Sequence, residues 1–460
     1  MFFSLNHDLI LRGWKDLPYM LVDIKNNRVK PLDELTFRTL KLFDSQHDLS
    51  DEKYMPVIKT FLKLGLIHQC ENGQDFNKFQ AYKKFNNHYI SMAHWSITGK
   101  CNFKCKHCFM SAPDVNAFEF SHEKISQIIQ QLDDCGIMNV SLTGGEPLVR
   151  RDFVKILDEL REHNINISRI YTNGALVNKN LLKELFARDF RPEFYFSFDG
   201  VGWHDWLRGI PGAELLTDNA MKLCADSGLI VHASMTMHDK NKFSLRDTIN
   251  HLAKLGVKIL KLGHISELGN WKENHFKALE AKELYQICLD YIPFYYQDNM
   301  PMEVNLAPLF SASPSQPDKF FIPGYTESYE PENKLLCSGS RNTIYIAPDG
   351  RILTCMLMCG MNIQEKFPSI TQKSLAECLE DNFYLNFANM TAKDFHEANH
   401  ECRDCKFSKH CYGGCRVAAL TADENNMMAK SPDLCEFFFG EWPQKVIDTV
   451  RKVRPDINIS

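Results

Sequence analysis

The sequence predicts an α/β protein whose centre is an open, partial (β/α)6 barrel of the TIM type. Two observations predict this fold. Between residues 91 and 270, six short apolar strands alternate with amphipathic helices, a pattern typical of parallel βαβ units. A cysteine-rich loop follows the first of these strands, and Gly-Gly-Glu ends the second. Function is therefore expected at the C-terminal ends of the strands, where the loops of such barrels gather.

The elements of the barrel are expected in regular alternation. The strands are HWSIT, NVSLTGG, ISRIYTNG, EFYFSFDG, LIVHASMTM and KILKLGHIS, in residues 94–98, 139–145, 167–174, 193–200, 229–237 and 258–266. The helices between them are expected near residues 122–135, 153–164, 179–188, 213–227 and 244–255.

Other domains are expected on both sides of the barrel. Residues 1–85 predict a small separate module, with two short strands around the Asn26-Asn27 turn and two helices after them. The core of residues 91–270 is followed by bridging helices and a long loop in residues 271–336. A second group of cysteines organises residues 337–440, and residues 441–460 form a C-terminal tail.

The composition narrows the class of protein. The chain has 460 residues, of which 44% are hydrophobic, and a net charge of −5, so nothing in it predicts a nucleic acid partner. No apolar run reaches the roughly 18 residues of a membrane helix, and the N-terminus does not resemble a signal peptide. We expect a soluble, cytoplasmic protein with no membrane partner. In a reducing cytoplasm, the clustered members of its 16 cysteines are expected to bind metal.

The first cysteine group is Cys101, Cys105 and Cys108. A 4Fe–4S cluster needs four ligands, so three local cysteines leave one iron free for a ligand that is not protein. A tetrahedral zinc site is the alternative, with His107 as the fourth ligand. Because His107 lies directly beside Cys108, however, it is poorly placed to bind the same ion.

The spacing CxxxCxxC after the first strand, followed by GGEP after the second, resembles the radical S-adenosylmethionine (AdoMet, SAM) superfamily. The resemblance extends over residues 91–270. It implies that the amino and carboxylate groups of AdoMet chelate the open iron. It also implies that the reduced cluster splits AdoMet to a 5′-deoxyadenosyl radical, which abstracts hydrogen from a substrate.

The same resemblance implies a set of AdoMet contacts: Gly144, Gly145, Glu146, Ser197, His107 and Leu262. The two glycines lack a Cβ, so the backbone can approach the ligand closely, and the glutamate can accept a hydrogen bond from the amino group. Ser197 is expected to face AdoMet, although a solvated serine at a strand end is the simpler interpretation. His107 and the backbone of Leu262-Gly263 are expected near the adenine.

The sequence HDWLRG in residues 204–209 resembles a stretch common in one subgroup of the superfamily. By this resemblance, His204, Asp205 and Arg208 either orient the substrate or brace the mouth of the barrel.

The second cysteine group resembles the seven-cysteine SPASM motif, a C-terminal extension of peptide-modifying radical AdoMet enzymes. Its members are Cys337, Cys355, Cys402, Cys405, Cys411, Cys415 and Cys435. The resemblance implies two auxiliary 4Fe–4S clusters, and hence three clusters in all. Two zinc sites are the alternative, since paired cysteines also suit zinc.

Family topology assigns the seven cysteines to two sets. The residues Cys402, Cys405, Cys411 and Cys435 would hold one cluster, and Cys337, Cys355 and Cys415 the other. Either Cys359 completes the second set or one iron stays open to a substrate thiolate. An auxiliary cluster suits a reaction in which the substrate radical must lose an electron.

Strands followed by helices in residues 1–85 resemble the winged-helix element that binds the leader of a precursor peptide. Such a module binds by β-augmentation, in which the leader adds a strand to an exposed sheet edge. A structural cap on the barrel is the alternative.

Together, these parts resemble the maturases of ribosomally synthesised, post-translationally modified peptides (RiPPs). The resemblance implies a thioether-forming oxidoreductase of the sactipeptide or ranthipeptide type, which binds a precursor peptide and receives electrons from a reductant such as flavodoxin or ferredoxin. Carbon–carbon or carbon–oxygen cross-linking would use the same parts. A peptide epimerase, a sulfatase-maturing (formylglycine-forming) enzyme and a non-catalytic iron–sulfur carrier are further alternatives. No catalytic acid or base stands out in the sequence.

Overall fold

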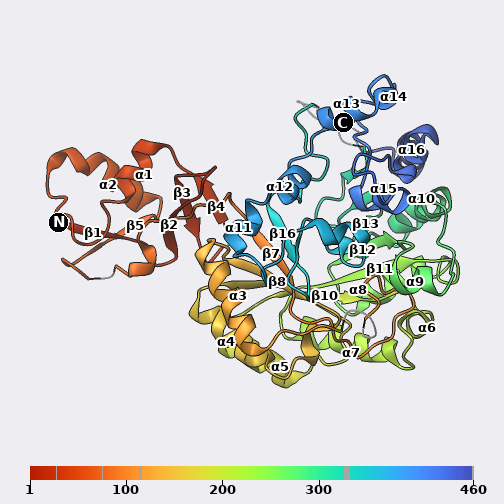
Figure 1. Ribbon diagram of the computed structural model, residues 1–460, viewed down its shortest axis with the longest axis horizontal. Coiled ribbons are helices and arrows are strands. Elements are labelled where there is room, and N and C mark those ends of the chain that lie inside the picture. Colours follow the sequence, from red (N-terminus) through yellow and green to blue (C-terminus); the bar gives the residue numbers. More distant parts are fainter. Residues whose placement is uncertain (27, 75, 113–116, 326–331, 458–460) are drawn as a thin grey trace. The chain divides into compact units, whose positions relative to one another are not determined.

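The computed structural model describes residues 1–26, 28–74, 76–112, 117–325 and 332–457. The chain divides into two compact units (Figure 1). The smaller comprises Met1–Tyr89 with Asp134–Gly136, and the larger comprises Ile90–Asp133 with Ile137–Ser460. The expected N-terminal module therefore falls within the smaller unit.

The smaller unit contains two sheets. β1 (Phe2–Leu5) pairs antiparallel with β5 (Ile67–Cys70). The second sheet has the order β4-β3-β2-β6, formed by β4 (Arg28–Pro31), β3 (Met20–Asp23), β2 (Leu9–Gly13) and β6 (Lys83–Lys84). β3 and β4 are the two strands expected around the Asn26-Asn27 turn, of which Asn27 lies outside the described residues.

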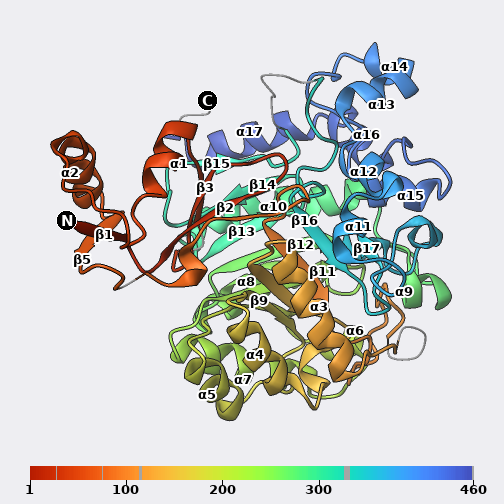
Figure 2. The same ribbon diagram turned by 60° about the vertical axis from the view of Figure 1, so that its left-hand side comes forward.

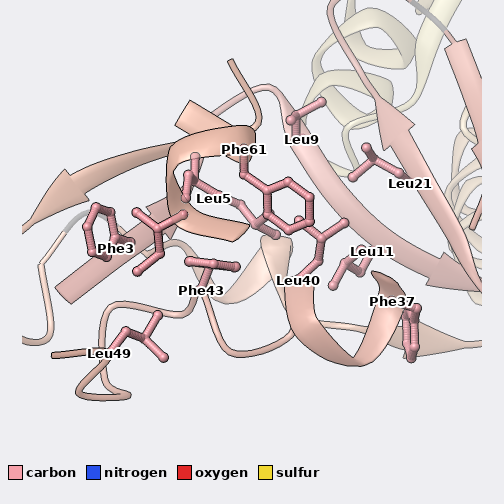
Figure 3. Packing of buried hydrophobic residues seen from close by; sticks show 12 residues of the cluster. Phe3, Leu5, Leu9, Leu11, Leu21, Phe37, Leu40, Phe43, Leu49 and Phe61 are labelled. Atoms are coloured by element: carbon pink, nitrogen blue, oxygen red, sulfur yellow. The ribbon is translucent and has the colours of Figure 1, made fainter. Parts of the chain in front are cut away.

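Two α-helices lie between β4 and β5 in the chain, α1 (Glu34–Leu40) and α2 (Met55–Lys63). The Asp33 side chain caps α1 by accepting the N–H of Thr36, as N-cap acids do. Short 3-10 helices occur at Glu52–Tyr54 and Lys78–Gln80. Figure 3 shows that the strands and both helices direct aromatic and aliphatic side chains into one core, to which Phe3, Leu40 and Phe61 belong.

The larger unit is organised by a run of parallel strands. These are β7 (Met92–Ser96), β8 (Asn139–Thr143), β9 (Asn166–Thr172), β10 (Glu193–Ser197), β11 (Val231–Met237) and β12 (Ile259–His264). They are the six strands expected from the sequence. The expected helices are α3 (His122–Asp134), α4 (Phe153–Glu162), α5 (Lys179–Ala187), α7 (Ala213–Asp226) and α8 (Leu245–Lys254).

Periodicity explains why these helices form and where they pack. In α4, Phe153, Ile156, Leu157 and Leu160 are buried at helical spacing and form one apolar face. Helices α3, α4, α5 and α7 lie together on one side of the parallel strands in both views (Figures 1 and 2). Each apolar face is thereby removed from water against the sheet, as expected for βαβ units.

The sheet extends beyond the six expected strands on both sides. Its order is β15-β14-β13-β12-β11-β10-β9-β8-β7-β16-β17. The added strands are β13 (Glu303–Leu306), β14 (Phe310–Ala312), β15 (Phe320–Phe321), β16 (Thr343–Ile346) and β17 (Ile352–Leu353). β13 and β16 continue the parallel arrangement, next to β12 and β7 respectively. Part of the segment expected as a long loop is thus an extension of the sheet.

The remaining helices of the larger unit are mostly short. They are α6 (His204–Arg208), α9 (Gly269–Glu273), α10 (Ala281–Gln297), α11 (Leu375–Leu379), α12 (Asn382–Ala388), α13 (Ala392–Ala398), α14 (His400–Arg403), α15 (Arg416–Ala422), α16 (Pro432–Phe439) and α17 (Trp442–Val453). Short 3-10 helices occur at Pro147–Val149, Met356–Met358 and Asn362–Lys366. No helix in the described part of the chain is both long and apolar enough to span a membrane.

Candidate functional site

The three cysteines of the first group lie in the irregular loop after β7 and line one cavity of about 400 Å³. Backbone N–H groups donate to two of the sulfur atoms: Phe103 to Cys101 Sγ at 3.4 Å and Ala112 to Cys108 Sγ at 3.3 Å. Hydrogen bonds of this kind favour the thiolate form of a cysteine. The structure therefore brings Cys101, Cys105 and Cys108 together and directs donors toward their sulfur atoms.

The electrostatics of this loop suit a cationic partner. Burial raises the pKa of Cys101 to about 12 and also raises the pKa values of Cys105 and Cys108. A buried thiolate is therefore costly unless positive charge lies beside it, and the irons of a cluster would supply that charge. The donor set thus fits an iron–sulfur cluster with three protein ligands.

Arg208 lies beside the central cysteine of this loop. Its Nη1 donates to Cys105 Sγ at 3.7 Å, and its Nε donates to Asp199 Oδ2 at 2.6 Å. Burial acts to raise the pKa of Asp199, but Arg208 and a hydrogen bond with His204 outweigh it and hold that pKa well below its usual range. Asp205 instead accepts backbone N–H groups at the start of α7. Of the stretch HDWLRG, Arg208 therefore reaches the cavity, while His204 and Asp205 brace the backbone.

The two glycines after β8 allow two loops to pack closely. Gly144 has a φ of +152°, and a Cβ there would collide with the Thr98 carbonyl oxygen. A Cβ on Gly145 would collide with the Lys100 carbonyl oxygen. Both glycines line the cavity. They hold the backbone against residues 98–100, which lead directly into Cys101.

The carboxyl group of Glu146 accepts three hydrogen bonds from the protein. Its Oε1 accepts the hydroxyl of Thr172 at 2.8 Å and the N–H of Leu148 at 3.2 Å, and its Oε2 accepts the N–H of Asn173 at 2.8 Å. The side chain is fully buried and is not among the residues that line the cavity. The contact of this carboxylate with AdoMet stays a prediction, whereas its hydrogen bonds to the turn after β9 are present in the structure.

Polar side chains at the ends of β10 and β11 form one wall of the cavity. Ser197, which the sequence singled out, lies in register with Ser234, and both line the cavity with Thr236. Ser234 and Thr236 were not expected as site residues. Their signal is the alternation of polar with apolar residues along β11, which places every second side chain on the inner face.

The floor of the cavity is aromatic. Tyr171 and Tyr195 stack with their ring centroids 4.8 Å apart and an interplanar angle of 26°. At β12, the lining residues are His264, Ile265 and Ser266 rather than Leu262, which is buried. The cavity lining in this part of the chain thus begins two residues after Leu262, and a backbone contact of Leu262-Gly263 with AdoMet stays a prediction.

His107 also lines the cavity, and burial lowers its pKa to about 3, so the ring is neutral. Its Nδ1 is buried and has no hydrogen-bond partner among the described residues. A buried polar atom without a partner fits a ligand group in the cavity, because such atoms are otherwise rare in folded proteins. That His107 lies near the adenine of AdoMet stays a prediction.

Four cysteines of the second group line a separate cavity of about 190 Å³: Cys402, Cys405, Cys411 and Cys435. They come from α14, from the loop after it and from α16. Phe407, Phe438 and Phe439 complete the apolar part of the wall. The structure thus assembles the four residues that the SPASM resemblance assigns to one auxiliary cluster.

The other three cysteines of the motif also lie near one another. Burial first, and then the charges of Cys415 and Cys337, raise the pKa of Cys355 to about 12. Cys359 has different neighbours: burial first, then Asp349, raises its pKa, while a hydrogen bond with Tyr345 lowers it. The structure therefore groups Cys355 with Cys415 and Cys337 and turns Cys359 toward β16.

The number of cysteines differs between the two cavities. Three line the first and four line the second, which are the ligand numbers predicted for an open and for a fully ligated 4Fe–4S cluster. In the part of the chain that the structure describes, no group of three or more His, Cys, Asp or Glu side chains is placed to hold a metal ion.

Comparisons with known protein families match two separate parts of the chain, and each part contains cysteines of one of the two groups. Residues 95–252 match the radical SAM superfamily, and residues 337–406 match the SPASM family, described as an iron–sulfur cluster-binding domain. The first match contains all three cysteines of the first loop and the Gly-Gly-Glu turn. The second contains most cysteines of the C-terminal group.

The individual relatives have low sequence identity to this chain, but the matches cover most of its length. The antilisterial bacteriocin subtilosin biosynthesis protein AlbA of Bacillus subtilis is 24% identical over 72% of this chain and 68% of its own length. An AdoMet-dependent heme synthase of Nitratidesulfovibrio vulgaris is 23% identical over 75% of this chain and 91% of its own. SuiB of Streptococcus suis, crystallised with AdoMet and with its precursor peptide SuiA, has a TM-score of 0.65 and 17% identity over 94% of this chain and 100% of SuiB.

The fold, the cysteine cavities and these matches define the class of protein. The chain is a radical SAM enzyme, as the spacing of its first cysteine group predicted. More particularly, it carries a SPASM iron–sulfur cluster-binding domain C-terminal to its radical SAM domain.

Proposed function

We propose that this protein is a RiPP maturase that binds the leader of a precursor peptide and installs a sulfur-to-carbon thioether in it. The observation that carries the proposal is the presence, in one chain, of an AdoMet-type cavity with three cysteines and a separate cavity lined by four. Two relatives with related names support it: AlbA, named for subtilosin biosynthesis, and SuiB, crystallised with a precursor peptide.

The proposed reaction is a two-electron oxidation. A carbon of the peptide loses a hydrogen atom, a cysteine thiol loses a proton, a sulfur–carbon bond forms, and one electron must leave. When bound, AdoMet and the three proposed 4Fe–4S clusters supply the hydrogen-abstracting radical and accept that electron. The chain's own residues would hold these groups and shape the cavity, in whose lining Tyr171 and Tyr195 stack on one another.

Leader binding is proposed for the smaller unit. Its order of strands followed by helices supports a winged-helix-like recognition element. β4 is an edge strand of its four-stranded sheet, so one side of it is free to pair with an added strand within that unit. The exposed side chains of Arg28 and Lys30 make this edge basic and favour an acidic leader.

For the auxiliary cluster with the incomplete set of cysteines, we propose three protein ligands: Cys337, Cys355 and Cys415. Cys359 is buried and faces Tyr345 and Asp349, which supports the alternative in which a substrate thiolate completes the set. A substrate sulfur held there would be positioned for bond formation and deprotonated at the same time. We further propose a cytoplasmic location and a flavodoxin or ferredoxin as the reductant.

The test is the mass of a small peptide encoded beside this gene after anaerobic co-expression with the enzyme. Loss of two hydrogens per event, with a thiol no longer open to alkylation, is the expected result. The same loss with every thiol still free would replace the thioether by a carbon–carbon or carbon–oxygen link. An unchanged mass with deuterium uptake from heavy water would point to epimerisation, and conversion of a cysteine to formylglycine would identify a sulfatase-maturing enzyme.

A further inference from the structure

A buried ion pair lies against the first cysteine loop. Arg208 donates from Nη1 to Cys105 Sγ at 3.7 Å and from Nε to Asp199 Oδ2 at 2.6 Å. Arg208 thus gives Cys105 a cationic side-chain donor. The sulfur atoms of Cys101 and Cys108 instead accept backbone N–H groups. The Asp199 side chain is fully buried, and that of Arg208 is 10% exposed.

The pair is held in place from several sides. Asp199 Oδ1 accepts the N–H of Thr236 at 2.9 Å, and the Asp199 N–H donates to His204 Nδ1 at 3.0 Å. A Cβ on Gly209, which follows Arg208, would lie 2.5 Å from the Lys104 carbonyl oxygen, so this turn packs directly on the cysteine loop. The carboxylate that accepts the guanidinium N–H is therefore itself held by a group on β11 and a group on α6.

We propose that Arg208 raises the reduction potential of the cluster held by Cys101, Cys105 and Cys108, and that Asp199 limits this rise. The inference rests on the proposed assignment of these three cysteines as cluster ligands. Reduction adds one negative charge to such a cluster, and hydrogen bonds to its sulfur atoms favour the more negative state. Arg208 is thus a positioning residue, which acts on the cluster through Cys105.

The geometry decides the sign. Arg208 directs Nη1 toward the sulfur and Nε toward the carboxylate, so the cation is the nearer charge to Cys105. Because Coulomb energy falls with distance and the site is buried, the nearer cation outweighs the carboxylate behind it. Removal of the cation should therefore lower the cluster's potential, and removal of the anion should raise it. A purely structural pair would not give shifts of opposite sign.

The experiment compares Arg208→Gln and Asp199→Asn in the cluster-loaded full chain. The potential is measured by an anaerobic redox titration followed by electron paramagnetic resonance, with the signal that AdoMet perturbs taken as that of the first cluster. We expect the reduction equilibrium to fall about tenfold in Arg208→Gln and to rise in Asp199→Asn; tenfold corresponds to about 59 mV for one electron. Arg208→Lys, which keeps the charge, should restore part of the loss.

A second ion pair provides the control. Arg246 and Asp298 are 2.6 Å apart on the same unit and do not line the AdoMet cavity. Arg246→Gln and Asp298→Asn should leave the potential unchanged. Shifts of the same sign in the two test variants, or no shift at wild-type iron content, would overturn the proposal.

The experiment also distinguishes two other outcomes, which are loss of iron from a variant and a wrong assignment of the cluster ligands. If Arg208→Gln fails to bind iron, Asp199→Asn alone decides, because its amide oxygen can still accept the Arg208 N–H: an unshifted potential then refutes the proposal. All measurements are made without a peptide, so failure of the proposed thioether chemistry does not affect them. Retention of the AdoMet-sensitive signal in Cys105→Ala would instead refute the cluster assignment.

Discussion

The carboxyl group of Glu146 makes the stability of the larger unit depend on pH. Burial raises its pKa from 4.5 to about 7, although hydrogen bonds from Asn173, Thr172 and Leu148 act in the opposite direction. Below pH 4.5 the group is protonated in the folded and unfolded states alike. As the pH rises toward 7, the unfolded chain releases the proton more readily, so the contribution of this group to stability is lost.

Replacement of Glu146 by Gln should remove this dependence. The difference between the two pKa values corresponds to roughly 3 kcal/mol of unfolding free energy, as an order of magnitude. Wild-type protein should therefore lose about that much stability relative to Glu146→Gln between pH 4.5 and 7.5. Denaturant unfolding of both proteins across this range measures the difference, and parallel pH profiles would contradict it.

Gly145 is the second residue at which a small change has a large expected effect. An added Cβ would meet the carbonyl oxygens of Gly99 and Lys100, which are backbone atoms and cannot turn aside. In Gly145→Ala, the loop that carries Cys101 must therefore move. Because a displacement of about 1 Å can cost about 100-fold in rate, we expect at least that loss in 5′-deoxyadenosine formation after reduction.

Gly339 offers the matched control for this substitution. A Cβ at Gly339 would have no heavy atom within 4 Å, and its φ lies outside the left-handed region. Gly339→Ala should therefore cleave AdoMet at the wild-type rate. Equal rates for both alanine variants would show that the packing of residues 98–100 on the Gly144-Gly145 turn is not needed for the chemistry.

At the scale of elements, helix α1 contains one leucine that contributes to the core of the smaller unit and one that does not. Leu40 is fully buried in the core shown in Figure 3, whereas Leu35 of the same helix is 76% exposed. Leu40→Ala should destabilise this unit by about 2–5 kcal/mol, the usual cost of deleting a buried leucine side chain. Leu35→Ala should change its stability by less than about 0.5 kcal/mol.

This pair of variants also tests the leader-binding role. Leu40→Ala should weaken precursor-peptide binding, measured by titration calorimetry, while AdoMet cleavage without peptide continues at the wild-type rate. Leu35→Ala should affect neither. If the destabilised Leu40→Ala protein still bound and modified its peptide normally, the smaller unit would not be the site of leader recognition.

The helices and strands of the larger unit show which elements a local sequence pattern can predict and which it cannot. All six core strands and five helices were predictable, because each has its own periodicity, such as the apolar face of α4. β13 and β16 were not, because each is short and its membership of the sheet depends on pairing with β12 or β7, which no local pattern encodes. Within the site, the cysteines were visible by spacing, but the contact of Arg208 with Cys105 joins residues 103 positions apart.

At the scale of the whole molecule, we expect the order of the SPASM region to depend on metal. The four thiols that line its cavity come from short helices and loops, with little apolar periodicity between them. Arg416, in contrast, donates to the carbonyl oxygens of Gly413, Gly414, Met427 and Ala429, which are protein contacts alone. Iron–thiolate bonds should therefore matter most for residues 400–411 and least for residues 416–429, which follow the proposed ligand Cys415.

Chelation of iron should open these two stretches in that order. We expect limited proteolysis to cut first within residues 400–411 after anaerobic treatment with a chelator, because metal binding there is coupled to folding. Cuts in residues 416–429 and in the barrel should follow later. Mass spectrometry of the fragments over time measures the order. Identical cleavage before and after iron removal would mean that protein contacts alone hold the SPASM region.

The pairing of β16 with β7 has a consequence for how the protein is made. Ser96 and Tyr345, whose hydroxyl groups lie 2.6 Å apart, are 249 residues apart in the chain. At about 5–20 residues per second, a ribosome takes roughly 12–50 s to cover that distance. Throughout this time, the outer edge of β7 has no partner from β16 and can pair with another nascent chain. The strand β16, which is synthesised late, thus covers the edge of β7, which is synthesised first. A chain that ends before residue 343 would leave this edge of β7 unpaired and prone to aggregation.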